Sequence, residues 1–227
     1  MNYATRINVV TIGVLFGISG ITHGLAETLQ GNQPTNGLII NAIAAGSPWT
    51  RWAEGGEAAF TMIPNFLVTG LLAMVVGLAI IVWSLRFVHK PQGPLIYLLL
   101  FLLLFLVGGG IGQVVFFIPA WAVATQMHKP LTWWRNRLPT SMRKGLAWAW
   151  CGLLITPVLL MLFAIFFAIF GYMPGVPDMG QVLNITLSMV GVSLLLLLLA
   201  FVAGFAYDIE QASTTAVATA THTAAPL

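Results

Sequence analysis

The amino-acid sequence predicts an all-α integral membrane protein: a bundle of about five transmembrane helices joined by short loops. First, 59% of the 227 residues are hydrophobic and only 7% are charged, whereas a soluble domain carries roughly 25% charged residues. Second, the apolar residues form stretches of the length that a membrane-spanning helix needs, about 20 residues. Third, the sequence lacks the ten-residue alternating pattern of a transmembrane β-barrel strand.

This composition excludes several classes of protein. Nine Lys and Arg and six Asp and Glu are too few to cover a water-soluble globule of this size, which excludes a soluble enzyme, a nucleic-acid-binding domain and a disordered chain. Cys151 is the single cysteine, so the chain forms no internal disulfide. We therefore expect the lipid bilayer to surround the protein, and we expect no nucleic-acid partner.

Five segments qualify as spans, and charged residues lie almost wholly outside them. The segments cover about 7–29, 58–86, 95–126, 145–171 and 181–207. The first has a signal-peptide-like Arg6 and small residues near its end, but glycines interrupt its apolar stretch, so we expect an uncleaved helix. Together the spans predict a single domain over residues 1–210, and the Ala/Thr-rich segment 211–227 predicts a disordered tail.

The third segment has two interpretations. As a single kinked helix it gives three basic residues on one side of the membrane and six on the other. As a helical hairpin that turns at Gly108-Gly109-Gly110, it gives eight on one side and Arg51 alone on the other. We favour the single crossing, because each hairpin arm would have only about 13–16 residues. Under both interpretations the positive-inside rule predicts a cell-membrane protein with a cytoplasmic C-terminus.

Small residues predict where the helices pack. A seam of glycines, in which spacings of four, three and four residues place every member on one face, runs along the first segment, and a looser seam runs along the second. The members are Gly13, Gly17, Gly20, Gly24, Gly70 and Gly77. Such seams let helix backbones approach closely in membranes, so we expect the first two helices to contact each other. Internal prolines at Pro64, Pro119 and Pro157 predict bends in segments two, three and four.

The main candidate site is the pair His23 and Glu27, which lie four residues apart on one face of the first helix, beside the glycine seam. Ionisable residues at membrane depth are costly and indicate function by default. Three further polar residues, Glu57, Asn65 and Gln113, are candidates for binding a ligand or ion. A single crossing of 95–126 would also bring His128 to this interface, so His23, Glu27, Glu57 and His128 are weak candidates for metal ligands.

Two simpler interpretations and three functions remain open. Glu27 could be solvated at its helix end, and His23 could be a packed, hydrogen-bonded residue. No catalytic motif or cofactor fingerprint occurs, which favours an accessory or binding subunit of a membrane complex, with other membrane subunits as partners. The alternative is a small transporter or channel whose cavity is lined by His23, Glu27, Asn65 and Gln113. A third is a redox protein holding a metal, or a haem between His23 and His128.

Overall fold

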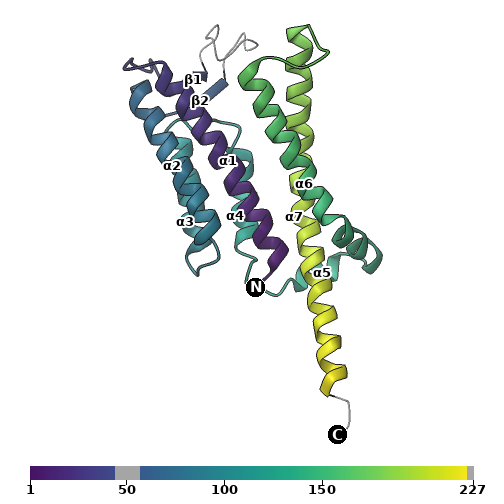
Figure 1. Ribbon diagram of the computed structural model, residues 1–227. Helices are drawn as coiled ribbons and strands as arrows, with labels where there is room; N and C mark the ends of the chain where they lie inside the picture. Colours follow the sequence, from purple (N-terminus) through teal and green to yellow (C-terminus); the bar gives the residue numbers. More distant parts are fainter. Residues whose placement is uncertain (44–56, 224–227) are drawn as a thin grey trace.

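The computed structural model describes residues 1–43 and 57–223 (Figure 1). Within these residues the chain forms seven helices and one small antiparallel sheet. In chain order the elements are α1 (Tyr3–Leu29), β1 (Ile39–Ile43), β2 (Glu57–Phe60), α2 (Phe66–Arg86), α3 (Gly93–Leu106), α4 (Val114–Ala124), α5 (Thr132–Arg137), α6 (Thr140–Phe170) and α7 (Met179–Thr223).

Among the described residues, four helices, rather than the expected five, are long and apolar enough to cross a membrane. They are α1, α2, most of α6 and the first part of α7, whereas α3 and α4 are shorter apolar helices. The prediction of a mostly helical chain with apolar spans is confirmed. The β1–β2 sheet, paired from Ile39 opposite Phe60, is an addition that the sequence did not indicate.

Segment 95–126 is a helical hairpin, so the expectation of one kinked crossing is wrong. His89 before α3 and His128 after α4 lie together, because the His128 ring Nε2 is 2.9 Å from the His89 carbonyl oxygen. The tip of the hairpin lies at the opposite end of the molecule, where the Gly108 N–H donates to the carbonyl of Phe60 (Figure 1).

The length argument against the hairpin fails because neither arm has to reach water at the tip. Broken helices are tolerated at membrane depth where protein buries them and pairs the freed backbone groups. Strand β2 and the residues that follow it do this here. Met62 N–H donates to Leu106, and Ile111 N–H donates to Ala58.

The glycine seam of α1 lies against both α2 and α3. A Cβ placed on Gly24 would be 2.5 Å from the Gly70 carbonyl oxygen, and one placed on Gly17 would be 2.8 Å from that of Gly77. Gly20 instead lies against the side chain of Leu104 on α3. The small residues thus let α1 approach α2 at backbone distance while still packing on the hairpin.

Helices α6 and α7 form a second, antiparallel pair that leans on the N-terminal part of α1 (Figure 1). Asn8 joins the two groups, since its side chain donates to the Ala200 carbonyl and accepts from the Trp150 indole. Helix α7 continues to Thr223, through much of the segment 211–227 that we expected to be disordered. Of the three prolines, Pro119 and Pro157 lie inside helices, whereas Pro64 precedes α2.

Candidate functional site

His23 and Glu27 lie near the C-terminal end of α1, and both point into the protein. Their exposed fractions are 4% and 0%. The four-residue spacing places them on the same face as the glycine seam, and the side chains meet the tip of the α3–α4 hairpin. The interpretation of Glu27 as a solvated helix-end residue therefore does not fit the structure.

Two glycines of the hairpin tip form the surface that covers this pair. Gly108 and Gly110 have φ values of +97° and +95°, a conformation that other residues rarely adopt. A Cβ on Gly108 would be 2.5 Å from Glu27 Oε2, and one on Gly110 would be 2.9 Å from His23 Nε2. Glycine is thus required at both positions for two reasons. The turn needs a positive φ, and the α1 side chains lie too close to leave space for a Cβ.

The Glu27 carboxyl is the most unusual group in the site. Both of its oxygen atoms are buried, and neither has a hydrogen-bond partner among the residues that the structure describes. Buried polar groups in proteins are nearly always hydrogen-bonded, so an exception needs an explanation. In addition, Glu27 lies in the last turn of α1, where the unpaired carbonyls and the helix dipole disfavour a negative charge.

Other polar groups surround the hairpin tip. The Gln113 side chain is 6% exposed and donates to the Gly109 carbonyl and, at 3.3 Å, to Ser19 Oγ on α1. Thr61 and Thr69 are also buried. Their hydroxyls are 2.6 Å apart, and Thr69 donates to the Val107 carbonyl. Gln113 was a predicted site residue, whereas the threonines and the covering glycines were not expected here.

Among the remaining predicted residues, Asn65 does not join the site. Asn65 is the N-cap of α2: it accepts from the Val68 N–H and donates to Asn32 Oδ1 at 2.7 Å. It therefore stabilises a helix end instead of lining a cavity. The Glu57 backbone begins β2, but its side chain lies outside the described part of the structure.

The structure separates His128 from the other proposed metal ligands. His128 bonds to His89, and the neighbouring Met127 carbonyl accepts from the Asn2 N–H at the start of α1. At 1.5 Å per residue, this point is about 30 Å along α1 from His23. A haem held between His23 and His128 is therefore not possible. Among the described residues no three His, Cys, Asp or Glu side chains form a group that could hold a metal ion.

A second buried carboxyl, Asp208, was missed because it lies just past the end of the predicted span 181–207. It is 8% exposed and belongs to α7. Its oxygens accept from the N–H groups of Ala4 and Thr5, each at 2.9 Å, and from the Thr5 hydroxyl at 2.7 Å. Asp208 thus caps the N-terminus of α1 from another helix, satisfying donors that a helix start leaves unpaired. An acidic residue close after an apolar span was the available signal.

No known family model, curated protein or solved structure matches the chain. The interpretation of the site therefore depends on its own chemistry.

Proposed function

We propose that the chain is a multi-pass membrane protein that binds a proton or a small cation at Glu27, as a transporter or channel does. The observation that carries this proposal is the fully buried Glu27 carboxyl, which has no hydrogen-bond donor among the described residues. The site combines a protonatable group, a histidine one turn away and a covering backbone, which is suited to ion binding instead of covalent catalysis.

The cost of burying charge explains why occupancy of this carboxyl matters. An isolated ionised carboxylate in an apolar environment is strongly unfavourable unless a proton or a cation balances it. The surroundings of Glu27 supply no compensating donor within the described residues, and the C-terminal end of α1 adds a partial negative charge. Binding or release of a positive charge at Glu27 would therefore change the free energy of the interaction between this carboxyl and the hairpin tip that covers it.

The hairpin gives this site a movable neighbour. Broken helices whose irregular backbone lines a polar site are a recurring feature of membrane transporters. The tip of the α3–α4 hairpin is irregular backbone of this kind: it packs on Glu27 through Gly108 and is connected to α1 by Gln113. These contacts support a role for the tip in controlling access to the carboxyl.

The charge distribution supports one orientation. With the hairpin in place, eight of the nine Lys and Arg residues fall at the end of the molecule that carries both termini (Figure 1). The positive-inside rule then assigns this end, including the C-terminus, to the cytoplasm of a cell-membrane protein. Single cysteines at Gln92 and Thr132, in a Cys151→Ala background, should react with a membrane-impermeant reagent from the same side. Labelling from opposite sides would contradict the hairpin.

The site is tested by reconstituting the full chain in liposomes and imposing a proton, sodium or potassium gradient. We expect wild-type protein to dissipate at least one of these gradients and Glu27→Gln to lose this activity. Asp178→Asn is the matched control, because Asp178 is an exposed carboxylate at the same end of the molecule. Infrared titration of the protonated carboxyl band reports binding independently of flux. Wild-type flux equal to that of protein-free liposomes, together with an infrared titration unchanged in Glu27→Gln, would refute the proposal.

A role as an accessory subunit of a membrane complex is the second candidate, and one observation favours it. Helix α6 exposes large aromatic side chains, including Phe163, Phe166 and Phe170, each about half exposed, on a pair of helices that meets the rest of the chain mainly near the start of α1. Purification in mild detergent tests this candidate: specific partners should co-purify, and a chain that migrates alone would contradict it.

A further inference from the structure

The end of the molecule that carries both termini has a large excess of positive charge. Eight Lys and Arg residues lie there, with two acidic residues, Asp208 and Glu210. Both carboxylates are already engaged, Asp208 with the start of α1 and Glu210 with Arg143. Six basic side chains at this end are exposed and form no ion pair within the described residues: Arg86, Lys90, Lys129, Arg135, Arg137 and Lys144.

The short helix α5 carries two of these cations, Arg135 and Arg137, and Arg137 lies over a tryptophan ring. Trp134 packs on Phe205 of α7, with ring centroids 4.9 Å apart, and thereby fixes α5 to the bundle. Trp133 is 58% exposed, and the Arg137 guanidinium lies 5.4 Å from the centre of its ring. Since tryptophan prefers the headgroup level of a bilayer, this packing places Arg137 at the depth of lipid phosphates.

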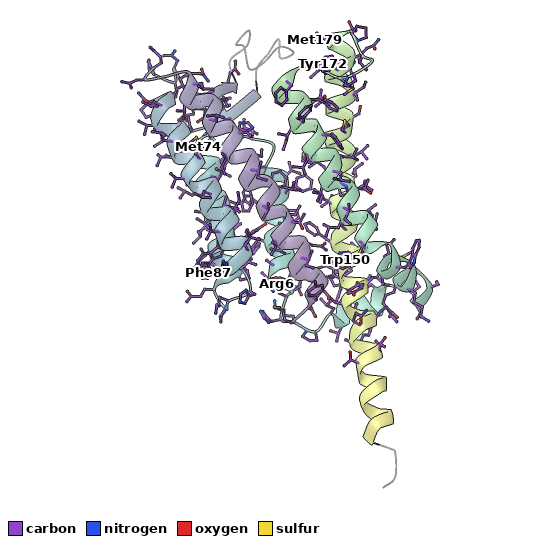
Figure 2. All side chains as sticks on the ribbon, viewed as in Figure 1. Arg6, Met74, Phe87, Trp150, Tyr172 and Met179 are labelled. Atoms are coloured by element: carbon purple, nitrogen blue, oxygen red, sulfur yellow. The ribbon has the colours of Figure 1, made fainter. Side chains whose placement is uncertain are left out.

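A groove of roughly 420 Å³ opens beside these cations, between α4, α5 and α7. Its walls combine apolar and aromatic side chains with polar groups, and they include Val123, Gln126, Leu131, Trp133, Trp134 and Phe205. The groove thus offers apolar and aromatic surface, and the Arg137 guanidinium lies beside it, over the ring of Trp133. Figure 2 shows Arg6 and Trp150 at this end of the molecule, with Tyr172 and Met179 at the opposite end.

We propose that this surface binds an anionic phospholipid of the leaflet that faces both chain termini. Arg135, Arg137 and Lys129 would contact the phosphate and the anionic headgroup, and an acyl chain would lie along the groove. Charge complementarity favours this occupant. A zwitterionic lipid would fill the groove with an acyl chain but would not neutralise the excess of cations. A free phosphate ion would neutralise the cations but would leave the groove unfilled. The proposal is independent of the site at Glu27.

Native mass spectrometry of the full chain in detergent tests the proposal. Phosphatidylglycerol and phosphatidylcholine are added in equal amounts, and the lipid retained by the protein is counted. We expect wild-type protein to prefer phosphatidylglycerol. Because each basic residue near an anionic lipid contributes roughly fivefold to binding, Arg135→Gln/Arg137→Gln should weaken that binding by roughly 25-fold.

Two matched variants separate recognition from general charge and from folding. Arg86→Gln/Lys90→Gln removes two cations from the same end but away from α5, and should bind phosphatidylglycerol as wild type does. Arg135→Lys/Arg137→Lys keeps the charge and should retain most of the binding. Equal retention of both lipids by wild-type protein, or an equal loss in the two Gln variants, would overturn the proposal. Displacement by sodium phosphate beyond that caused by sodium chloride of equal ionic strength would identify free phosphate as the ligand and also overturn it.

Discussion

Two carboxyl groups are buried at opposite ends of the same helix, and they have very different surroundings. Asp208, from α7, lies at the N-terminus of α1 and accepts three hydrogen bonds from Ala4 and Thr5. Glu27, in the last turn of α1, accepts none from the residues that the structure describes. Asp208 is placed where N–H donors are unpaired and the helix dipole is positive, whereas Glu27 is placed where carbonyls are unpaired and the dipole is negative.

Burial alone therefore does not assign a role to an acidic residue. A carboxylate whose hydrogen bonds are made holds two helices together, and its charge is balanced by fixed donors. A carboxyl without donors contributes little to folding and changes its charge only with the binding of a proton or cation. Removal of the charge should therefore destabilise the protein strongly at Asp208 and only slightly at Glu27.

Asp208→Ala should have the largest effect on stability. It leaves the Ala4 and Thr5 N–H groups without their acceptor, and hydrogen bonds to charged groups contribute about 1.5–3 kcal/mol each, so we expect a loss of about 3 kcal/mol in the free energy of unfolding in bicelles. Glu210→Ala is the control, because its ion pair with Arg143 is partly exposed and such pairs contribute under about 1 kcal/mol. Equal losses in the two variants would contradict a capping role for Asp208.

Gly108→Ala should have the next largest effect. The new Cβ would be strained at a φ of +97° and would collide with the Glu27 carboxyl, so we expect a loss of about 2 kcal/mol. Gly112→Ala, in the same turn, meets no atom within 4 Å and should have little effect. In the double variant Gly108→Ala/Glu27→Ala, part of the loss should be recovered. A strictly additive double variant would show that the tip and Glu27 are not coupled.

Glu27→Gln should have the smallest effect on stability. The neutral amide has the same shape and removes the cost of burying a charge, so we expect the free energy of unfolding to change by less than about 1 kcal/mol. The measurement is the same unfolding assay, made alongside the flux assay. A loss as large as that of Asp208→Ala would mean that Glu27 is a structural group, and the comparison between the two carboxyls would fail.

Local sequence patterns predicted that His23 and Glu27 face inward, but they did not predict what covers them. The four-residue spacing of His23 and Glu27, together with the glycine seam, indicated a shared inward face. The sequence was compatible with both candidate topologies for 95–126, and the distribution of Lys and Arg between the two sides of the membrane favoured the hairpin. The length criterion gave the wrong preference because it assumes that each apolar helix must cross the bilayer. It has no means of anticipating that β2 pairs with the backbone of the hairpin tip.

Composition and periodicity by themselves determined that this is a helical chain with apolar spans, since an apolar solvent requires backbone hydrogen bonds within each helix. Which polar groups contact one another depends on how the helices pack. In the folded chain His128 lies at the far end of α1 from His23, and Asn65 caps α2. Gly108 contacts Glu27, and Asp208 accepts hydrogen bonds at the start of α1. The physical reason is that these contacts join residues distant in sequence, so they follow from the path of the chain and not from any local pattern.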